Sequence, residues 1–150
     1  MFEQTMLATW GDMDFNGHMR NTAFLDKSAD MRLAFFSAHG LPMDEFLRLG
    51  IGPVVRKDEV EYFREIRLFE PIRVTIAAAG LSEDGARFVI RNEFFRNDGT
   101  LAARVISSGG WLDLSARRLV VPPAGLQEAL RTMPRTEHFS VLPPLKAARP

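Results

Sequence analysis

Residues 10–40, WGDMDFNGHMRNTAFLDKSADMRLAFFSAHG, join a polar, glycine-containing segment to one long apolar helix, and this junction decides the fold. Apolar side chains recur at helical spacing after the polar segment, while Asp26 and Lys27 are expected to face solvent. Asn21 is the expected N-cap and Gly40 the expected end of the helix. The apolar stripe consists of Phe24, Leu25, Ala29, Met31, Phe35, Phe36 and Ala38.

Segments with period-two alternation flank this helix on both sides. One strand is expected before it, at residues 2–10, and four after it, at 54–68, 72–78, 88–94 and 101–114. Asp84-Gly85 and Asp98-Gly99 separate the last three and are typical of tight hairpins, so these strands should form an antiparallel meander. The sequence thus predicts an α+β fold in which a five-stranded antiparallel sheet wraps one long central helix.

The outer face of this sheet and the end of the chain give weaker signals. Phe63, Val105 and Trp111 fall on strand faces opposite the predicted core set, where a second subunit would cover them. Residues 124–131 predict a short helix, and residues 132–150, which are rich in proline, predict an irregular tail.

Length, charge and cysteine content exclude several classes of protein. A chain of 150 residues suits a single domain, expected here to span 1–150. Nineteen basic and nineteen acidic side chains leave no net charge, so the basic excess that nucleic acid or anionic membranes require is missing. The absence of cysteine excludes disulfides, thiolate nucleophiles and cysteine zinc sites. The sequence has no basic leader and no apolar run of ~18 residues, so a cytoplasmic location is expected.

Polar residues concentrate between Asp12 and Asn21, just before the helix, and three chemistries compete for them. The order D-x-D-x-N-G from Asp12 matches the start of an EF-hand loop, but Ala23 stands where the bidentate glutamate is required. An aspartyl nucleophile for phosphoryl transfer also uses D-x-D after a strand, but it normally needs a parallel sheet and a magnesium cage. Both interpretations are therefore weak.

Acyl transfer, the third chemistry, uses all of the unusual residues in the segment. Free amides and the dipole at a helix N-terminus favour negative charge that develops on a carbonyl oxygen. The amides near Met19, Arg20 and Asn21 are the expected donors, and Asp14 is the expected general base or nucleophile. Asp12 is instead expected to accept hydrogen bonds from nearby backbone amides in a turn.

The same residues carry a family resemblance. The run DMDFNGHMRNTAF, residues 12–24, resembles the signature of hotdog-fold acyl thioesterases, in particular the 4-hydroxybenzoyl-CoA thioesterase branch and the related acyl-carrier-protein thioesterases. The run VVRKDEVEYF, residues 54–63, is similar to the long second strand of that branch. The resemblance extends over about residues 2–122, and it implies the hotdog fold.

The resemblance implies roles residue by residue, with Asp14 on the catalytic carboxylate. The pattern D-x-N-x-H-x-x-N of the acyl-carrier-protein relatives is filled by Asp14, Asn16, His18 and Asn21. Two positions depart from the family: Arg20 replaces the first asparagine of the usual pair, and Phe24 lacks the hydroxyl of the common tyrosine. The residues expected to contact the substrate are Asn16, His18, Met19, Arg20, Asn21, Phe24 and Tyr62.

The resemblance to this family implies an acyl-CoA substrate, hydrolysis without metal or cofactor, and free acid and CoA as products. The alternatives are an acyl-carrier-protein thioesterase, a hotdog hydratase and a non-catalytic acyl-CoA-binding module. Arg87, Arg117 and Arg118 lie where the family receives the nucleotide, and guanidinium groups suit its phosphates. The resemblance also places the site between two subunits, so a homodimer or a dimer of dimers is expected.

Overall fold

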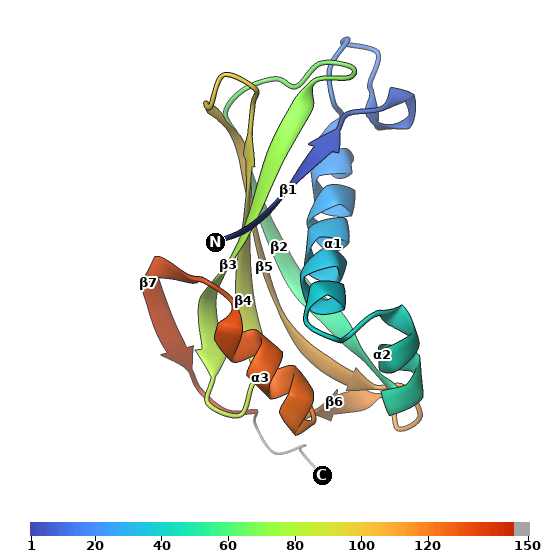
Figure 1. The fold of residues 1–150 in the computed structure, drawn as a ribbon, viewed down its shortest axis with the longest axis vertical. Helices are drawn as coiled ribbons and strands as arrows, with labels where there is room; N and C mark the ends of the chain where they lie inside the picture. The colour runs from blue at the N-terminus through green and yellow to red at the C-terminus, as the bar shows by residue number, and fades with distance from the viewer. Residues whose placement is uncertain (146–150) are drawn as a thin grey trace.

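The helix α1 (Asn21–Ala38) lies along one face of a twisted sheet, as Figure 1 shows for the computed structural model of the chain, which describes residues 1–145. The sheet order is β1–β3–β4–β5–β2, and neighbours along this path are antiparallel. These strands are β1 (Phe2–Leu7), β3 (Pro71–Ser82), β4 (Arg87–Phe95), β5 (Leu101–Asp113) and β2 (Ile51–Tyr62). The arrangement confirms the predicted wrap of five antiparallel strands around one helix.

Two further strands and three shorter helical segments complete the described chain. β6 (Arg118–Val120) pairs with the end of β5, and β7 (Arg135–Leu142) pairs with β3 in parallel. The helical segments are η1 (Trp10–Asp12), α2 (Met43–Leu49) and α3 (Ala124–Thr132), the last as predicted. Within residues 1–145, no helix combines the length and the apolar character needed to span a bilayer.

The core fills the space between α1 and the inner face of the sheet. Its sheet side comes from alternate residues of two neighbouring strands, as predicted: Ile72, Val74, Ile76 and Ala78 of β3, and Phe88, Ile90 and Phe94 of β4. Aromatic rings pack edge to face across it, Phe24 on Phe94 and Phe36 on Trp111, with centroids 5.3 and 5.6 Å apart. Each such ring contributes about 2 kcal/mol through burial. α1 is therefore fixed against the sheet along its length.

Val105 and Trp111 are fully buried in this core, so the prediction that they face outward is wrong. Alternate residues of a strand point the same way, and the β5 face that carries both meets the helices. Trp111 stacks on Phe46 of α2, and its Nε1 donates to the Gly85 carbonyl at 2.9 Å. Phe63, just beyond β2, is 39% exposed.

Two predicted strands are too long. β1 ends before Trp10, which lies in η1 and is 80% exposed. β2 ends at Tyr62 because the amides of Phe63 and Arg64 both donate to the Ala102 carbonyl, so the ladder with β5 stops there. The chain then turns, although the apolar alternation continues in the sequence.

The tail contains a strand where an irregular segment was predicted. β7 runs parallel to β3, and the Ala78 amide donates to the Pro134 carbonyl at 2.6 Å. Gly80 permits the close approach, since a Cβ there would lie 2.8 Å from Leu142 Cδ2. Residues 146–150 of the predicted tail lie outside the described residues.

The ends of α1 and the hairpin turns follow the sequence closely. α1 begins at Asn21 with Arg20 as its N-cap, one residue earlier than predicted, and no side chain caps it. Gly40, just past the helix, has a left-handed φ of +80°, which confirms the predicted stop. Gly85 and Gly99 have φ values of +73° and +86°, as the predicted tight turns require.

Candidate active site

A cavity of about 360 Å³ opens beside the N-terminal end of α1. It is lined by Asp14, His18, Met19, Asn21, Phe24, Tyr62, Phe63, Arg64, Glu65 and Ile66. Of the residues predicted to act on the substrate, only Asn16 and Arg20 are outside this lining. The loop before α1 and the segment after β2 therefore build the cavity together.

A tight turn holds the Asp14 carboxylate at the cavity. The Asn16 amide donates to Asp14 Oδ1 at 2.9 Å, and the Gly17 amide donates to the Asp14 carbonyl at 3.3 Å. Gly17 has a φ of +84°, a conformation that glycine adopts without strain. The Asp14 amide donates to the His18 carbonyl at 2.9 Å and closes the turn. One carboxylate oxygen is thus held by the backbone, and the other faces the His18 side chain.

His18 lies between two carboxylates. Its Nδ1 is 3.7 Å from Asp14 Oδ2, and its Nε2 is 3.7 Å from Glu65 Oε1, both beyond hydrogen-bond distance. Glu65 was not predicted, because it follows β2 and no local spacing links it to Asp14. A hydrogen bond from the Met19 amide to the Ile66 carbonyl, 2.7 Å, joins the two segments. Within residues 1–145, no group of three or more histidine or acidic side chains is arranged to hold a metal ion.

The backbone amides at the start of α1 divide into used and free donors. The Met19 and Arg20 amides, two of the predicted carbonyl donors, already donate to the carbonyls of Ile66 and Asp12, at 2.7 and 2.8 Å. The first-turn amides of a helix have no partner one turn back. Among the described residues no side chain caps this turn, so of the three predicted donors the Asn21 amide is left for a ligand, and the Thr22 amide beside it is also free.

Tyr62 and Phe24 form the aromatic wall of the cavity. The two rings meet edge to face with centroids 5.4 Å apart, and Phe24 is only 3% exposed. Tyr62 Oη donates to the Asn21 carbonyl at 3.0 Å, which fixes the ring over the first turn of α1. Burial raises the pKa of the Tyr62 phenol, so this group stays a neutral donor.

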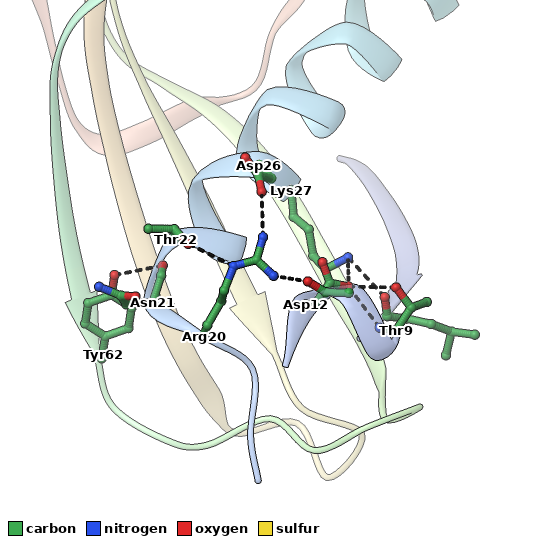
Figure 2. Close-up of polar contacts among 10 residues, drawn as sticks. Thr9, Asp12, Arg20, Asn21, Thr22, Asp26, Lys27 and Tyr62 are labelled. Carbon is green, nitrogen blue, oxygen red and sulfur yellow. Dashed lines mark hydrogen bonds and ion pairs between the residues drawn. The ribbon is translucent and has the colours of Figure 1, made fainter. Parts of the chain in front are cut away.

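Arg20 turns away from the cavity and fastens the loop to the helix. Its guanidinium donates to the Gly11 carbonyl, to Thr22 Oγ1 at 3.0 Å and to Asp26 Oδ2 at 3.4 Å (Figure 2). Asn16 supplies its backbone amide to Asp14 rather than its side chain to the cavity.

Asp12 has the turn role that the sequence predicts and an ion pair that it does not. Asp12 Oδ2 accepts hydrogen bonds from the Thr9 amide and hydroxyl, at 2.9 and 3.0 Å, and lies 3.1 Å from Lys27 Nζ (Figure 2). Lys27 also donates to the Leu7 carbonyl at 3.0 Å and is only 8% exposed, so its predicted solvent position is wrong. Burial alone would raise the pKa of Asp12, but the hydrogen bonds from Thr9 and Lys27 outweigh it and hold the pKa below its ordinary value.

Comparison with known families decides what kind of site this is. A family model described as the Thioesterase-like superfamily matches residues 8–130. The chain belongs to this superfamily. The match covers the whole cavity, and it confirms the predicted hotdog fold and the prediction of a thioesterase-like enzyme. A search of curated protein sequences found no match.

Solved structures of similar fold agree with the superfamily. A hypothetical protein from Staphylococcus aureus, solved in complex with CoA, is 21% identical with a TM-score of 0.78, covering 99% of this chain and 95% of that one. A 1,4-dihydroxy-2-naphthoyl-CoA thioesterase from Synechocystis is 17% identical with a TM-score of 0.78, covering 87% and 96%. A DHNA-CoA thioesterase from Staphylococcus aureus is 19% identical with a TM-score of 0.79, covering 86% and 87%.

In a single chain, the arginines predicted to bind the nucleotide lie far from the cavity. Arg87 lines a second cavity of about 320 Å³ together with Arg56 and Lys57. Arg87 lies seven positions before Phe94 on β4, a span of about 23 Å, and Phe94 packs on Phe24 of the cavity wall. Arg117 and Arg118 lie at the β5–β6 turn, at the end of the sheet opposite the start of α1 (Figure 1). Within one chain, these arginines therefore do not reach the cavity beside α1.

Proposed function

We propose that this protein is an acyl-CoA thioester hydrolase whose reaction takes place at the N-terminal end of α1. The observation that carries the proposal is that the Asp14 carboxylate and the uncapped first turn of α1 border one cavity. Its aromatic wall, Phe24 and Tyr62, offers an apolar surface to the acyl group.

The thioester carbonyl oxygen accepts a hydrogen bond from the Asn21 amide, where the helix dipole also favours negative charge. Asp14 then has two routes. As a base, it takes a proton from a water molecule whose oxygen adds to the carbonyl carbon; as a nucleophile, it adds directly and forms an anhydride that water cleaves. In the base route the proton taken from water passes to the sulfur as the C–S bond breaks, and His18, beside Asp14, is placed to carry it. In the nucleophile route the sulfur leaves as a thiolate that takes its proton from water, and hydrolysis of the anhydride frees the acid. Both routes release free acid and CoA.

The coenzyme end of the substrate requires a second subunit, and β2 supports a homodimer. β5 pairs with one edge of β2, and no strand within residues 1–145 covers the other. Uncovered edges of this length favour strand addition. In antiparallel pairing with its own copy, the run Arg56-Lys57-Asp58-Glu59 is self-complementary, because Arg56 faces Glu59 and Lys57 faces Asp58.

This pairing would bring the predicted nucleotide-binding arginines to the site. It sets the Ile51 end of one β2 beside the Tyr62 end of the other. Ile51 pairs with Asp113, and Asp113 pairs with Arg118, so Arg118 and its neighbour Arg117 would approach the other subunit's cavity. We expect Arg56→Glu to dissociate the dimer in light scattering and the double variant R56E/E59R to restore it. A wild-type protein that is monomeric at micromolar concentration would contradict a site shared between two subunits.

Thiol release with acetyl-, hexanoyl-, palmitoyl- and benzoyl-CoA tests the function. We expect hydrolysis of at least one, at a rate that Asp14→Asn lowers at least ~10²-fold. Activity only on acyl-carrier-protein thioesters would identify these, and not acyl-CoA, as the substrate class. Tight binding of all four acyl-CoAs without hydrolysis would indicate a non-catalytic binding module. A single turnover in H₂¹⁸O tests the anhydride route, because water that cleaves the anhydride at the Asp14 carboxyl carbon leaves ¹⁸O in Asp14 and ¹⁶O from the protein in the product, a labelling that the base route cannot give.

A further inference from the structure

The loop that carries Asp14, residues 9–20, closes on itself and packs on the core through two side chains, Met19 and Met13. The isolated bridge between Met13 and Met19 and the hydrogen bond from the Arg20 amide to the Asp12 carbonyl join its two arms. The tip is open to solvent, and Phe15 is fully exposed. The polar contacts between this loop and α1 lie at its base.

Two cations that the catalytic proposal does not use sit at that base, both bonded between the loop and α1. Lys27, in the second turn of α1, reaches back to Asp12 and to the Leu7 carbonyl at the end of β1. Arg20 reaches from the Gly11 carbonyl to Asp26. Figure 2 shows the two groups on neighbouring sides of the same turn.

The Lys27–Asp12 pair is the stronger tie. The side chains of Lys27 and Asp12 are 11% and 16% exposed, and Thr9 adds two hydrogen bonds to the carboxylate. Removing one member of a pair shielded in this way leaves the other charge desolvated, which prevents a simple rearrangement around the gap. The exposed pair Arg20–Asp26, at 34% and 67%, holds the loop less firmly.

We propose that Lys27, and to a smaller extent Arg20, are positioning residues that set the distance between the Asp14 carboxylate and the first-turn amides of α1. Asp14 lies two residues beyond Asp12, and the Asn21 amide lies at the start of the helix that carries Lys27. The ion pair therefore connects the two groups that must meet the same carbonyl. A displacement near 1 Å between such groups costs on the order of 10²-fold in rate. The inference rests on the proposed function of Asp14.

A double-mutant cycle tests this coupling. Lys27→Met keeps most of the apolar stem of the side chain and removes the charged ammonium group, and we expect it to lower kcat about 10-fold or more on the best acyl-CoA of the panel with KM changed less than about twofold. In the D14N background the same change should cost nothing further, since no positioned carboxylate remains. Arg131→Met, which removes an exposed ion pair with Glu128 on α3, is the matched control and should leave kcat unchanged.

Hydrogen exchange gives a second readout that does not depend on activity. In Lys27→Met, the amides of Asp14, Met19 and Arg20 should exchange about tenfold faster through local opening of the loop, because their hydrogen bonds close it, while amides of β4 accelerate only as far as the loss of global stability requires. Arg20→Met should show the same pattern with a smaller amplitude.

The outcomes separate the two proposals. If D14N retains wild-type activity, the proposed function of Asp14 fails, whatever Lys27→Met does. If D14N lowers kcat as expected but Lys27→Met leaves kcat unchanged, or leaves the three loop amides at their wild-type exchange rates, the positioning role is overturned and Lys27 only stabilises the fold. An equal loss from Lys27→Met with and without Asp14 would also overturn it.

Discussion

Asp12 and Asp14 lie two residues apart in one loop, yet their surroundings are opposite. Asp12 Oδ2 accepts from the Thr9 amide and hydroxyl and pairs with the nearly buried Lys27, and Asp12 does not border the cavity. Asp14 has one oxygen bonded to the Asn16 amide and the other free toward His18 and the cavity. The difference teaches that a carboxylate serves structure when a shielded cation and a backbone amide bind it away from a cavity, and chemistry when one of its oxygens is left open at a cavity.

Neutralising each carboxylate should separate the two roles, with the largest effect at Asp14. Asp14→Asn keeps the shape but removes the basic oxygen, so we expect kcat on the best acyl-CoA to fall at least ~10²-fold without loss of fold. Asp12→Asn should lower kcat by about 10-fold, since it disturbs position only. Thiol release for both, with circular dichroism as the control for folding, checks the order. Equal losses of kcat in the two variants would show that Asp12 and Asp14 do not have separate roles.

The free energy of unfolding should depend more on the contacts of Asp12 than on Asp14, the reverse of the order expected for kcat. Lys27→Met leaves the Asp12 charge without its partner, and we expect the free energy of unfolding to fall by about 3 kcal/mol. Asp14→Asn should leave it nearly unchanged, because the carboxylate borders a cavity and its turn is also closed by backbone hydrogen bonds. Urea unfolding of both variants measures the difference. A larger loss for Asp14→Asn than for Lys27→Met would contradict the comparison.

Low pH should remove the contribution of the Asp12 carboxylate to the free energy of unfolding. The pKa of Asp12 is lower in the folded chain than its ordinary value, so its contribution to stability is complete above about pH 4 and is lost as pH falls through the folded pKa. The difference in unfolding free energy between wild type and Asp12→Asn should therefore stay constant from pH 6 to about pH 4 and narrow as the pH is lowered from there to about pH 2. A difference that stays constant down to about pH 2 would show that the Asp12 charge plays no part.

Local patterns were enough to predict the scaffold. The helical stripe of α1, the alternation of β3 and β4 and the glycines at Gly40, Gly85 and Gly99 all act within a few residues, and the structure keeps them. Asp14 and the cavity residues on the same loop were predictable for the same reason, helped by a family resemblance that the superfamily match supports.

The failures depend on contacts between distant segments. Lys27 is buried only because Asp12 folds back onto α1, and Glu65 reaches the cavity only because β2 ends at Tyr62. β7 needs the bare backbone at Gly80 of β3 to pair. Neither helical nor strand periodicity carries information of this kind.

The most direct measurement of the central claim is a crystal structure with a non-hydrolysable acyl-CoA analogue that keeps the carbonyl and replaces the thioester sulfur by CH₂. We predict that the carbonyl oxygen lies about 2.7–3.1 Å from the Asn21 nitrogen, with Asp14 Oδ2 next to the carbonyl carbon and the acyl group against Phe24 and Tyr62. A ligand bound with its carbonyl away from the start of α1, or in the second cavity near Arg87, would contradict the proposed site.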